Sequence, residues 1–284
     1  MPPMREAWDR FWFGEVDPRR LALLRIGWAL VALWAYVPLL WEGWWLFSDE
    51  GLLPLETIPL DWISLLVNPL WQISSPGGVQ AFIAATLGLL VLTALGLGTR
   101  VVQPLAWLML LSLVNRNGAW TSGADSVLRV FGFYLMFLPT GRVWSLDARL
   151  FPQSTTAPTA WPLRLFQLQV CILYVKTGMV KAAEPIWQSG EAVFQAMSCG
   201  AYWRFRMEPL LSSRWFQGFC ALADYATLVV EIGFPLVWIR RLRPFVLLAG
   251  LGLHVGISAF LDIGAFTFAM LWTYLAFVEL PERR

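Results

Sequence analysis

The stretch VQAFIAATLGLLVLTALGLG, residues 79–98, contains no charged side chain. A helix of this length is about 30 Å long at roughly 1.5 Å per residue, which matches the hydrocarbon core of a bilayer. Backbone polar groups in lipid must be satisfied within the segment, and a helix does this. We therefore predict that residues 79–98 form a membrane-spanning helix.

Seven further apolar runs approach the same length, which predicts an all-α integral membrane protein with about eight transmembrane helices. Residues of the apolar set AVILMFWYC make up 58% of the chain and charged residues make up 14%. In soluble domains about half of the residues are apolar and about a quarter are charged. One run begins near Gln103-Pro104 and is short, so a re-entrant segment stays open there. The seven runs are 22–40, 101–115, 124–141, 161–181, 219–239, 244–261 and 264–280.

The distribution of arginine predicts the orientation of these spans, because short cytoplasmic loops collect Lys and Arg. Alternate loops carry arginine, and residues 41–78 contain neither Lys nor Arg. We therefore expect both termini on the cytoplasmic side, with an interfacial helix preceding the first span. The segment 182–218 carries arginines and aromatic residues on the expected outer side, so we predict a structured loop there. The cytoplasmic arginines are Arg5, Arg10, Arg19, Arg20, Arg100, Arg142, Arg149, Arg164, Arg240, Arg241, Arg243, Arg283 and Arg284.

Charge and cysteine usage exclude several other functions. The net charge of +2 is scattered along the chain, so we expect no nucleic-acid partner. Cys171, Cys199 and Cys220 lack the spacing of a metal site, and we expect no metal. Cys199 with Cys220 is the one candidate disulfide. No tandem repeat is apparent, so we expect a single domain over 1–284.

Charged groups inside spans are expensive in a bilayer and need a partner, a cavity or a function. Asp125 and Arg129 are four residues apart, so they are expected to pair on one helix face. Glu231 and His254 lie at matching depths on consecutive spans. We predict a hydrogen bond between them, with a structural and a proton-handling role both open.

One face of the span 161–181 is polar. Lys176 lies about 140° around the helix from Lys181, so the two lysines face different neighbours. Lys181 could reach the headgroups, pair with Glu184, or act as a base. The polar face consists of Gln167, Cys171, Tyr174, Gly178 and Lys181.

The predicted topology gathers polar residues toward the outer side, where we expect a mixed-charge cavity. A nearby arginine there would favour the neutral amine of Lys181, which is the form that accepts a proton. The expected cavity residues are Asn115, Arg116, Asn117, Asp125, Arg129, Lys181 and Glu184.

Three segments resemble the HTTM family, the horizontally transferred transmembrane domain, which includes the vitamin K-dependent γ-glutamyl carboxylase. They read NRNGAWTSGADSVLRVFGFYLMFLPTGRVWSLD (115–147), QLQVCILYVKTGMVKAAEPIWQSGEAVF (167–194) and LHVGISAFLDIGAFTFAML (253–271). RIGWALVALW near the N-terminus and SDEGLLP (48–54) fit the same pattern. The resemblance extends over nearly the whole chain, although each segment alone is a weak motif.

The resemblance implies chemistry that depends on a lipid quinol, either reduced vitamin K or menaquinol. In the carboxylase a lysine deprotonates the quinol, which reacts with oxygen so that a γ-proton is removed from a peptide glutamate and CO2 adds. The matching position is Lys181. Asn115, Arg116, Asp125, Arg129 and Tyr174 are the implied cofactor-binding residues, with Glu231, His254 and Lys176 as further candidates.

The sequence also departs from the carboxylase pattern. Asp125 stands where the carboxylase has a histidine, and no segment corresponds to the large lumenal domain, so the peptide or protein substrate is not implied. A non-enzymatic accessory protein for maturation or export of a partner peptide stays an alternative. A transporter is disfavoured because no inverted repeat is apparent. We expect a bacterial plasma membrane, with the candidate site toward the outer face.

Overall fold

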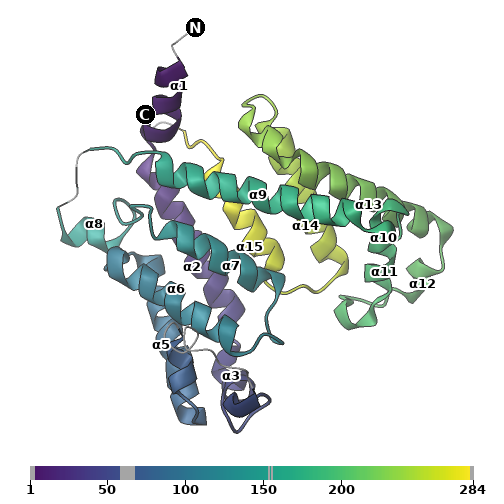
Figure 1. The fold of residues 1–284 in the computed structure, drawn as a ribbon, viewed down its shortest axis with the longest axis horizontal. Coiled ribbons are helices and arrows are strands. Elements are labelled where there is room, and N and C mark those ends of the chain that lie inside the picture. The colour runs from purple at the N-terminus through teal and green to yellow at the C-terminus, as the bar shows by residue number, and fades with distance from the viewer. Residues whose placement is uncertain (1–3, 58–67, 153, 155, 282–284) are drawn as a thin grey trace. The chain divides into compact units, whose positions relative to one another are not determined.

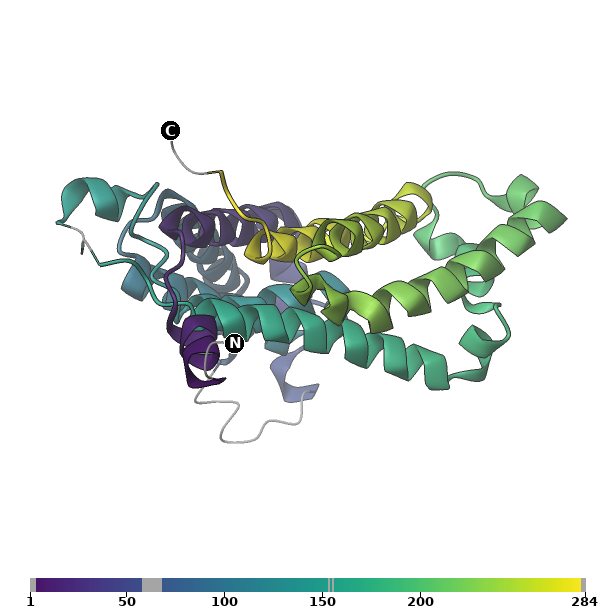
Figure 2. The same cartoon turned by 90° about the horizontal axis from the view of Figure 1, so that it is seen from above.

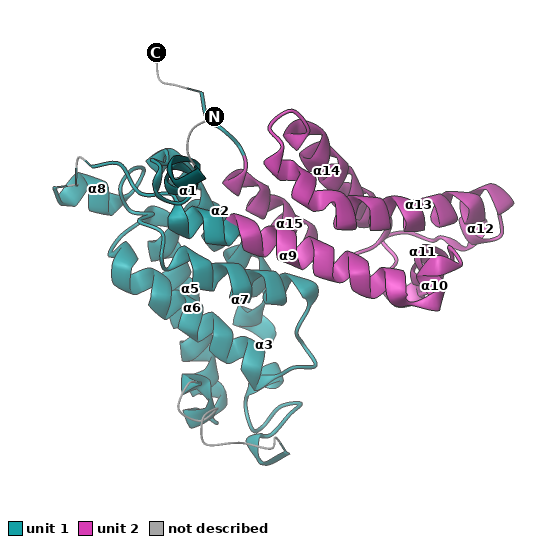
Figure 3. Cartoon of the chain, turned by 45° about the horizontal axis from the view of Figure 1, so that its top comes forward, with its two compact units in different colours: residues 1–166, 278–284 teal, residues 167–277 magenta. Residues whose placement is uncertain are grey.

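The computed structural model describes residues 4–57, 68–152, 154 and 156–281, which are mostly helical. Within these residues β-structure is limited to two isolated bridges, Glu15 with Thr159 and Trp203 with Leu261. The chain divides into two compact units, residues 1–166 with 278–284 and residues 167–277 (Figure 3). The predicted all-α fold is confirmed.

Unit 1 is a bundle in which α5 contacts α2, α3 and α6, while α7 packs against α2 and α6 (Figure 1). The long helix α9 (Trp161–Ala183) begins in this unit and continues into unit 2. Two 3-10 turns, η1 (Leu55–Thr57) and η2 (Pro69–Gln72), follow α3. The helices are α1 (Met4–Phe13), α2 (Pro18–Tyr36), α3 (Leu39–Phe47), α5 (Pro76–Leu95), α6 (Thr99–Arg116), α7 (Gly123–Leu135) and α8 (Leu146–Leu150).

Local sequence signals explain where these helices begin and end. The Ser75 hydroxyl caps α5 by accepting a hydrogen bond from the Gly78 amide, and Pro76 occupies the first helical turn, where a proline costs no hydrogen bond. The same helix ends at Gly96, whose φ of 72° is left-handed and favours glycine. Pro38 lies at the break between α2 and α3, which meet at an angle of 69°, because proline cannot continue the helical hydrogen bonding.

A buried arginine joins α2 to the loop before α8. The Arg25 side chain is fully buried and donates to the carbonyl oxygens of Thr140 and Trp144. Nearby, the Asp147 carboxylate accepts hydrogen bonds from the amides of Gly98 and Thr99 at 2.6 and 2.8 Å. The Arg25 contacts hold α2 against the loop before α8, and the Asp147 contacts hold the start of α6 against the start of α8.

Unit 2 contains the rest of α9 and a set of helices in which α13 contacts α11, α12 and α14 (Figure 2). Helix α14 also packs against α15. Met197, Met207, Phe216, Cys220 and Leu261 form a buried apolar cluster. The elements are α10 (Pro185–Gln188), α11 (Ala192–Ser198), η3 (Gly200–Tyr202), α12 (Glu208–Leu211), α13 (Arg214–Gly233), η4 (Phe234–Trp238), α14 (Arg243–Phe260), α15 (Phe266–Thr273) and η5 (Tyr274–Ala276).

The structure supports a membrane protein, but it does not confirm eight spans. Four segments of the described chain are long and apolar enough to cross a bilayer, and the bent pair α2 and α3 would add a fifth. Helix α7 has 13 residues, about 20 Å at 1.5 Å per residue, and is too short to cross alone. The count of eight and the orientation stay predictions. The four are Pro76–Leu95, Trp161–Ala183, Arg214–Trp238 and Arg243–Phe260.

The predicted loop 182–218 is structured, since α10, α11, η3 and α12 lie within it and α13 begins at Arg214. Arg204 lies 3.6 Å from Asp262, and Arg206 lies 3.5 Å from Glu208. The candidate disulfide does not form, because all three cysteines are free. Cys199 is exposed, whereas Cys220 is buried in the apolar cluster.

Candidate functional site

Lys181 and Glu231 form an ion pair within unit 2, between α9 and α13. The Glu231 side chain is 8% exposed and that of Lys181 is 29% exposed. A Cβ at Gly178 would lie 2.9 Å from the Glu231 Cβ, so the absence of a side chain there lets α9 approach α13 closely. The alternative in which Lys181 pairs with Glu184 is therefore wrong, because the partner is Glu231. The reach of Lys181 to the headgroups stays a prediction.

An aromatic ring covers the same amine. The Lys181 Nζ atom lies 5.1 Å from the centre of the Trp187 ring, close enough for a cation–π attraction. The amine thus has a carboxylate and an aromatic face as neighbours. Trp187 belongs to α10, directly after the end of α9.

A buried aromatic network continues the polar face of α9. The Tyr174 hydroxyl lies 2.6 Å from His254 Nε2 and 2.6 Å from the Tyr274 hydroxyl. The Phe234 ring stacks on Tyr174 with centres 4.0 Å apart and planes 7° apart. We call Lys181, Glu231, Tyr174, His254 and Tyr274 the Lys181 cluster, because Lys181 and Tyr174 lie on one face of α9 and contact the other three members through the ion pair and the two hydroxyl contacts.

The residues predicted to share the polar face of α9 face the interior of the protein. Gln167, Cys171, Tyr174 and Gly178 are buried, and Lys181 at the end of the face is half-buried. Lys176 is exposed and lines a shallow apolar groove with Ile172, Met179 and Pro235. The prediction that the two lysines have different neighbours is confirmed.

The predicted hydrogen bond between Glu231 and His254 is wrong, because each side chain has another partner. Glu231 pairs with Lys181, and His254 lies against Tyr174. The second carboxylate oxygen of Glu231 and the Nδ1 atom of His254 are buried, and no described residue is hydrogen-bonded to either. Since buried polar atoms rarely lack partners, these two are candidates for contact with a ligand.

Asp125 has a structural role within unit 1. Its carboxylate accepts hydrogen bonds from the Tyr36 hydroxyl at 2.5 Å and from the Ser122 amide and hydroxyl at 2.6 and 2.8 Å. Ser122 and Asp125 together cap the N-terminus of α7, which satisfies amides that the helix leaves open. The predicted ion pair with Arg129 is absent from the described residues, because Tyr36 and Ser122 occupy the carboxylate.

Two more of the expected cavity residues also bind the protein's own backbone. Arg116 is 1% exposed and donates to the Leu53 carbonyl at 2.9 Å, with Asp49 3.2 Å away. The Asn117 amide donates to the Leu46 carbonyl at 2.9 Å. Arg116 therefore holds the segment after α3 and Asn117 holds the last turn of α3, whereas Asn115 is exposed at the end of α6.

The expected outer cavity combines residues that the structure places in separate units. Asn115, Arg116, Asn117, Asp125 and Arg129 belong to unit 1, and Lys181 and Glu184 to unit 2, so this cavity stays a prediction. The structure does join Lys181, Tyr174, Glu231 and His254 in one cluster. Tyr274 is the member that the sequence analysis missed, because a tyrosine in an apolar run carries no distinguishing signal.

Comparison with known proteins gives one match. The family model described as the HTTM domain matches residues 82–281, which include every member of the Lys181 cluster. No curated protein matches the chain. No solved structure matches it either.

Proposed function

Because the chain belongs to the HTTM-domain family, which is associated with vitamin K-dependent carboxylase-type membrane proteins, we propose that it is a carboxylase-like membrane enzyme. It would use a lipid quinol to modify a peptide or protein substrate at glutamate. The observation that carries this proposal is the Lys181–Glu231 pair beside buried polar atoms that lack partners.

Lys181 is the proposed base. A protonated amine cannot accept a proton, so the ammonium form must first lose one. The Glu231 carboxylate is within hydrogen-bonding contact of the Lys181 Nζ atom and can take that proton in a weakly polar environment, where a neutral pair competes with an ion pair. Glu231 therefore serves as the acceptor that prepares the Lys181 amine.

The residues around this pair fit a quinol. A quinol carries two hydroxyl donors on an aromatic ring, and both the free Glu231 oxygen and His254 Nδ1 can accept a hydrogen bond. Tyr174 and Phe234 provide aromatic surface beside them. When bound, the quinol would supply, with oxygen, the base strong enough to remove a γ-proton from glutamate. The chain's own residues would orient its ring and receive a hydroxyl proton at Lys181.

Asp125 and Arg116 stabilise unit 1 in this proposal and do not bind the quinol. The Asp125 carboxylate already accepts three hydrogen bonds, so it has little capacity left for a ligand. Arg129 and Asn115 stay candidate cofactor-binding residues without such an assignment.

The test is quinol-dependent incorporation of labelled CO2 into peptides from the same organism, measured with the full chain in membranes. Lys181→Ala is expected to lower the rate by a factor of about 10² to 10⁴, the usual contribution of a general base. Glu231→Gln is expected to lower it less, and to shift the pH dependence, because the amine remains. Lys176→Ala is the matched control, since Lys176 lies on the same helix and is exposed.

Full activity of Lys181→Ala would refute the role of Lys181 as the base. Equal losses for Lys176→Ala and Lys181→Ala would show that the effect is not specific to the cluster. Copurification of a quinone with the wild type and its loss in His254→Ala would support the binding residues separately from the rate.

The exposed aromatic side chains of the segment 182–218 favour a second candidate, an accessory protein that presents a partner peptide during export. Tyr202 is 55% exposed, Phe205 45% and Trp215 66%, and aromatic residues dominate many binding surfaces. Isolation of the full chain with a stable peptide partner and without quinone would support this function over the enzyme.

A further inference from the structure

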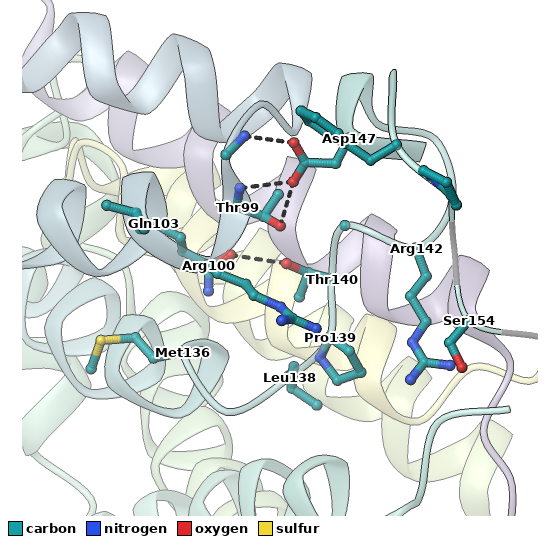
Figure 4. A pocket seen from close by; sticks show the side chains of 15 residues that line it. Thr99, Arg100, Gln103, Met136, Leu138, Pro139, Thr140, Arg142, Asp147 and Ser154 are labelled. Atoms are coloured by element: carbon teal, nitrogen blue, oxygen red, sulfur yellow. Dashed lines mark hydrogen bonds between the residues drawn. The ribbon is translucent and has the colours of Figure 1, made fainter. Parts of the chain in front are cut away.

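A cavity of about 430 Å³, lined by both polar and apolar side chains, lies in unit 1, between the start of α6 and the loops around α8 (Figure 4). Thr99, Arg100 and Gln103 enter it from α6, and Thr140 and Arg142 enter it from the segment after α7. It contains no member of the Lys181 cluster. The proposed enzyme chemistry therefore does not account for this cavity.

Two arginines, Arg100 and Arg142, line the cavity together with one carboxylate, Asp147. Neither Arg100 nor Arg142 forms an ion pair within residues 4–57, 68–152, 154 and 156–281. Arg142 donates to the Thr156 carbonyl, which carries no net charge. Asp147 also lines the cavity, but its carboxylate is bound to the Gly98 and Thr99 amides and faces the charge of Arg25. An anion in the cavity would therefore meet two arginines.

The side-chain amide of Gln103 provides a hydrogen-bond donor beside the two arginines. Gln103 is 2% exposed and its carbonyl oxygen accepts a hydrogen bond from the Thr140 hydroxyl at 3.0 Å (Figure 4). With its oxygen in that bond, the Gln103 amide has its nitrogen left to donate into the cavity that the side chain lines, and no described residue accepts a hydrogen bond from this nitrogen. An amide nitrogen that lines a cavity can donate to a bound ligand, and phosphate oxygens are strong acceptors.

Apolar side chains on the cavity wall indicate that the anionic group belongs to a molecule with an apolar part. Val101 and Phe151 line the cavity and are 63% and 59% exposed, and Met136 and Leu138 lie beside them. A free phosphate ion would leave this apolar wall uncovered, whereas the glycerol and acyl groups of a phospholipid would cover it. The arginine distribution also predicts that Arg100 and Arg142 lie in cytoplasmic loops, where anionic lipids attract basic residues.

We propose that this cavity binds the phosphate group of an anionic phospholipid. Arg100 and Arg142 pair with the phosphate oxygens, the Gln103 amide donates to one of them, and the apolar wall contacts the glycerol and acyl groups. The lipid anchors the loops that join α5 to α6 and α7 to α8. This proposal does not depend on an enzymatic function.

The test titrates the purified full chain in neutral detergent with phosphatidylglycerol or phosphatidylcholine and counts bound lipid by native mass spectrometry. We expect preferential binding of phosphatidylglycerol. At about 1 kcal/mol per basic residue, Arg100→Gln and Arg142→Gln should each weaken that binding about fivefold, and the double variant about 30-fold. Arg149→Gln is the matched control, because Arg149 is exposed on α8 and does not line the cavity.

A parallel arm titrates inorganic phosphate and follows the thermal unfolding midpoint of the same proteins, which also checks that each variant folds. Stabilisation by phosphatidylglycerol alone, lost in the double variant and kept in Arg149→Gln, supports the lipid site. Equal stabilisation by inorganic phosphate through the same arginines would overturn the lipid as occupant in favour of a soluble phosphate compound. Unchanged phosphatidylglycerol binding in the folded double variant would overturn the site itself.

Discussion

The Lys181–Glu231 pair makes each side chain depend on the other for stability. Lys181→Met leaves the Glu231 carboxylate, 8% exposed, without its partner. Because the Lys181 side chain is 29% exposed, water moderates the penalty, and we expect a loss of about 1–3 kcal/mol. Lys181→Met combined with Glu231→Leu should recover much of this loss. Thermal unfolding in detergent of the wild type, Lys181→Met, Glu231→Leu and the double variant measures these losses of stability. Additive effects of the two substitutions would contradict the pair.

We expect the stability of the fold to depend on pH through the Asp147 carboxyl. Partial burial alone raises the pKa of its carboxyl, but hydrogen bonds from Thr99 and Gly98 and the charge of Arg25 hold the pKa below its ordinary value. A lowered pKa stabilises the fold at pH values above the unfolded pKa, near 4, and this contribution disappears as the pH falls through the folded pKa. Asp147→Asn should therefore lower the unfolding midpoint at pH 7, and the two proteins should converge in strong acid. A constant difference from pH 7 to pH 2 would contradict this role.

Two of the glycines of helix α14, Gly250 and Gly252, differ in their surroundings. A Cβ at Gly250 would collide with the Tyr274 hydroxyl, whereas a Cβ at Gly252 would meet no atom within 4 Å. Gly250→Ala should cost about 1–3 kcal/mol through overpacking and disturb the Tyr274–Tyr174 contact. Gly252→Ala should be neutral or gain up to about 1 kcal/mol through helix propensity. Equal unfolding midpoints for the two variants would show that α14 does not pack against Tyr274 in this way.

The sequence largely predicted which residues share a face of a helix. It did not predict which side chains of other helices contact that face. The polar face of α9 follows from its periodicity, because residues three and four apart share a helix face wherever the helix lies. The partner of that face depends on how α13 is rotated about its axis and how closely it approaches at Gly178. The sequence consequently predicted a Glu231–His254 contact, and the structure has Lys181–Glu231 and Tyr174–His254 instead.

At the scale of the whole molecule, the native cysteines report on the predicted orientation. Cys199 is exposed in the segment expected outside, whereas Cys171 and Cys220 are buried. A membrane-impermeant maleimide applied to intact cells should therefore label the wild type at Cys199 and leave Cys199→Ser unlabelled. All three thiols should react after denaturation without reductant, because no disulfide joins them. Labelling of Cys199 only after the membrane is permeabilised would reverse the predicted orientation.

The sequence by itself determined the all-α membrane class and which residues share the polar face of α9, because hydropathy and helical period are properties of a segment. It also identified the HTTM resemblance that the family match bears out. Only the tertiary structure decided that Asp125 caps α7, that Glu231 belongs to Lys181, and that Arg100 and Arg142 border one cavity. These depend on which side chains separate helices bring within a few ångströms, and hydrogen bonds and ion pairs form only at that range.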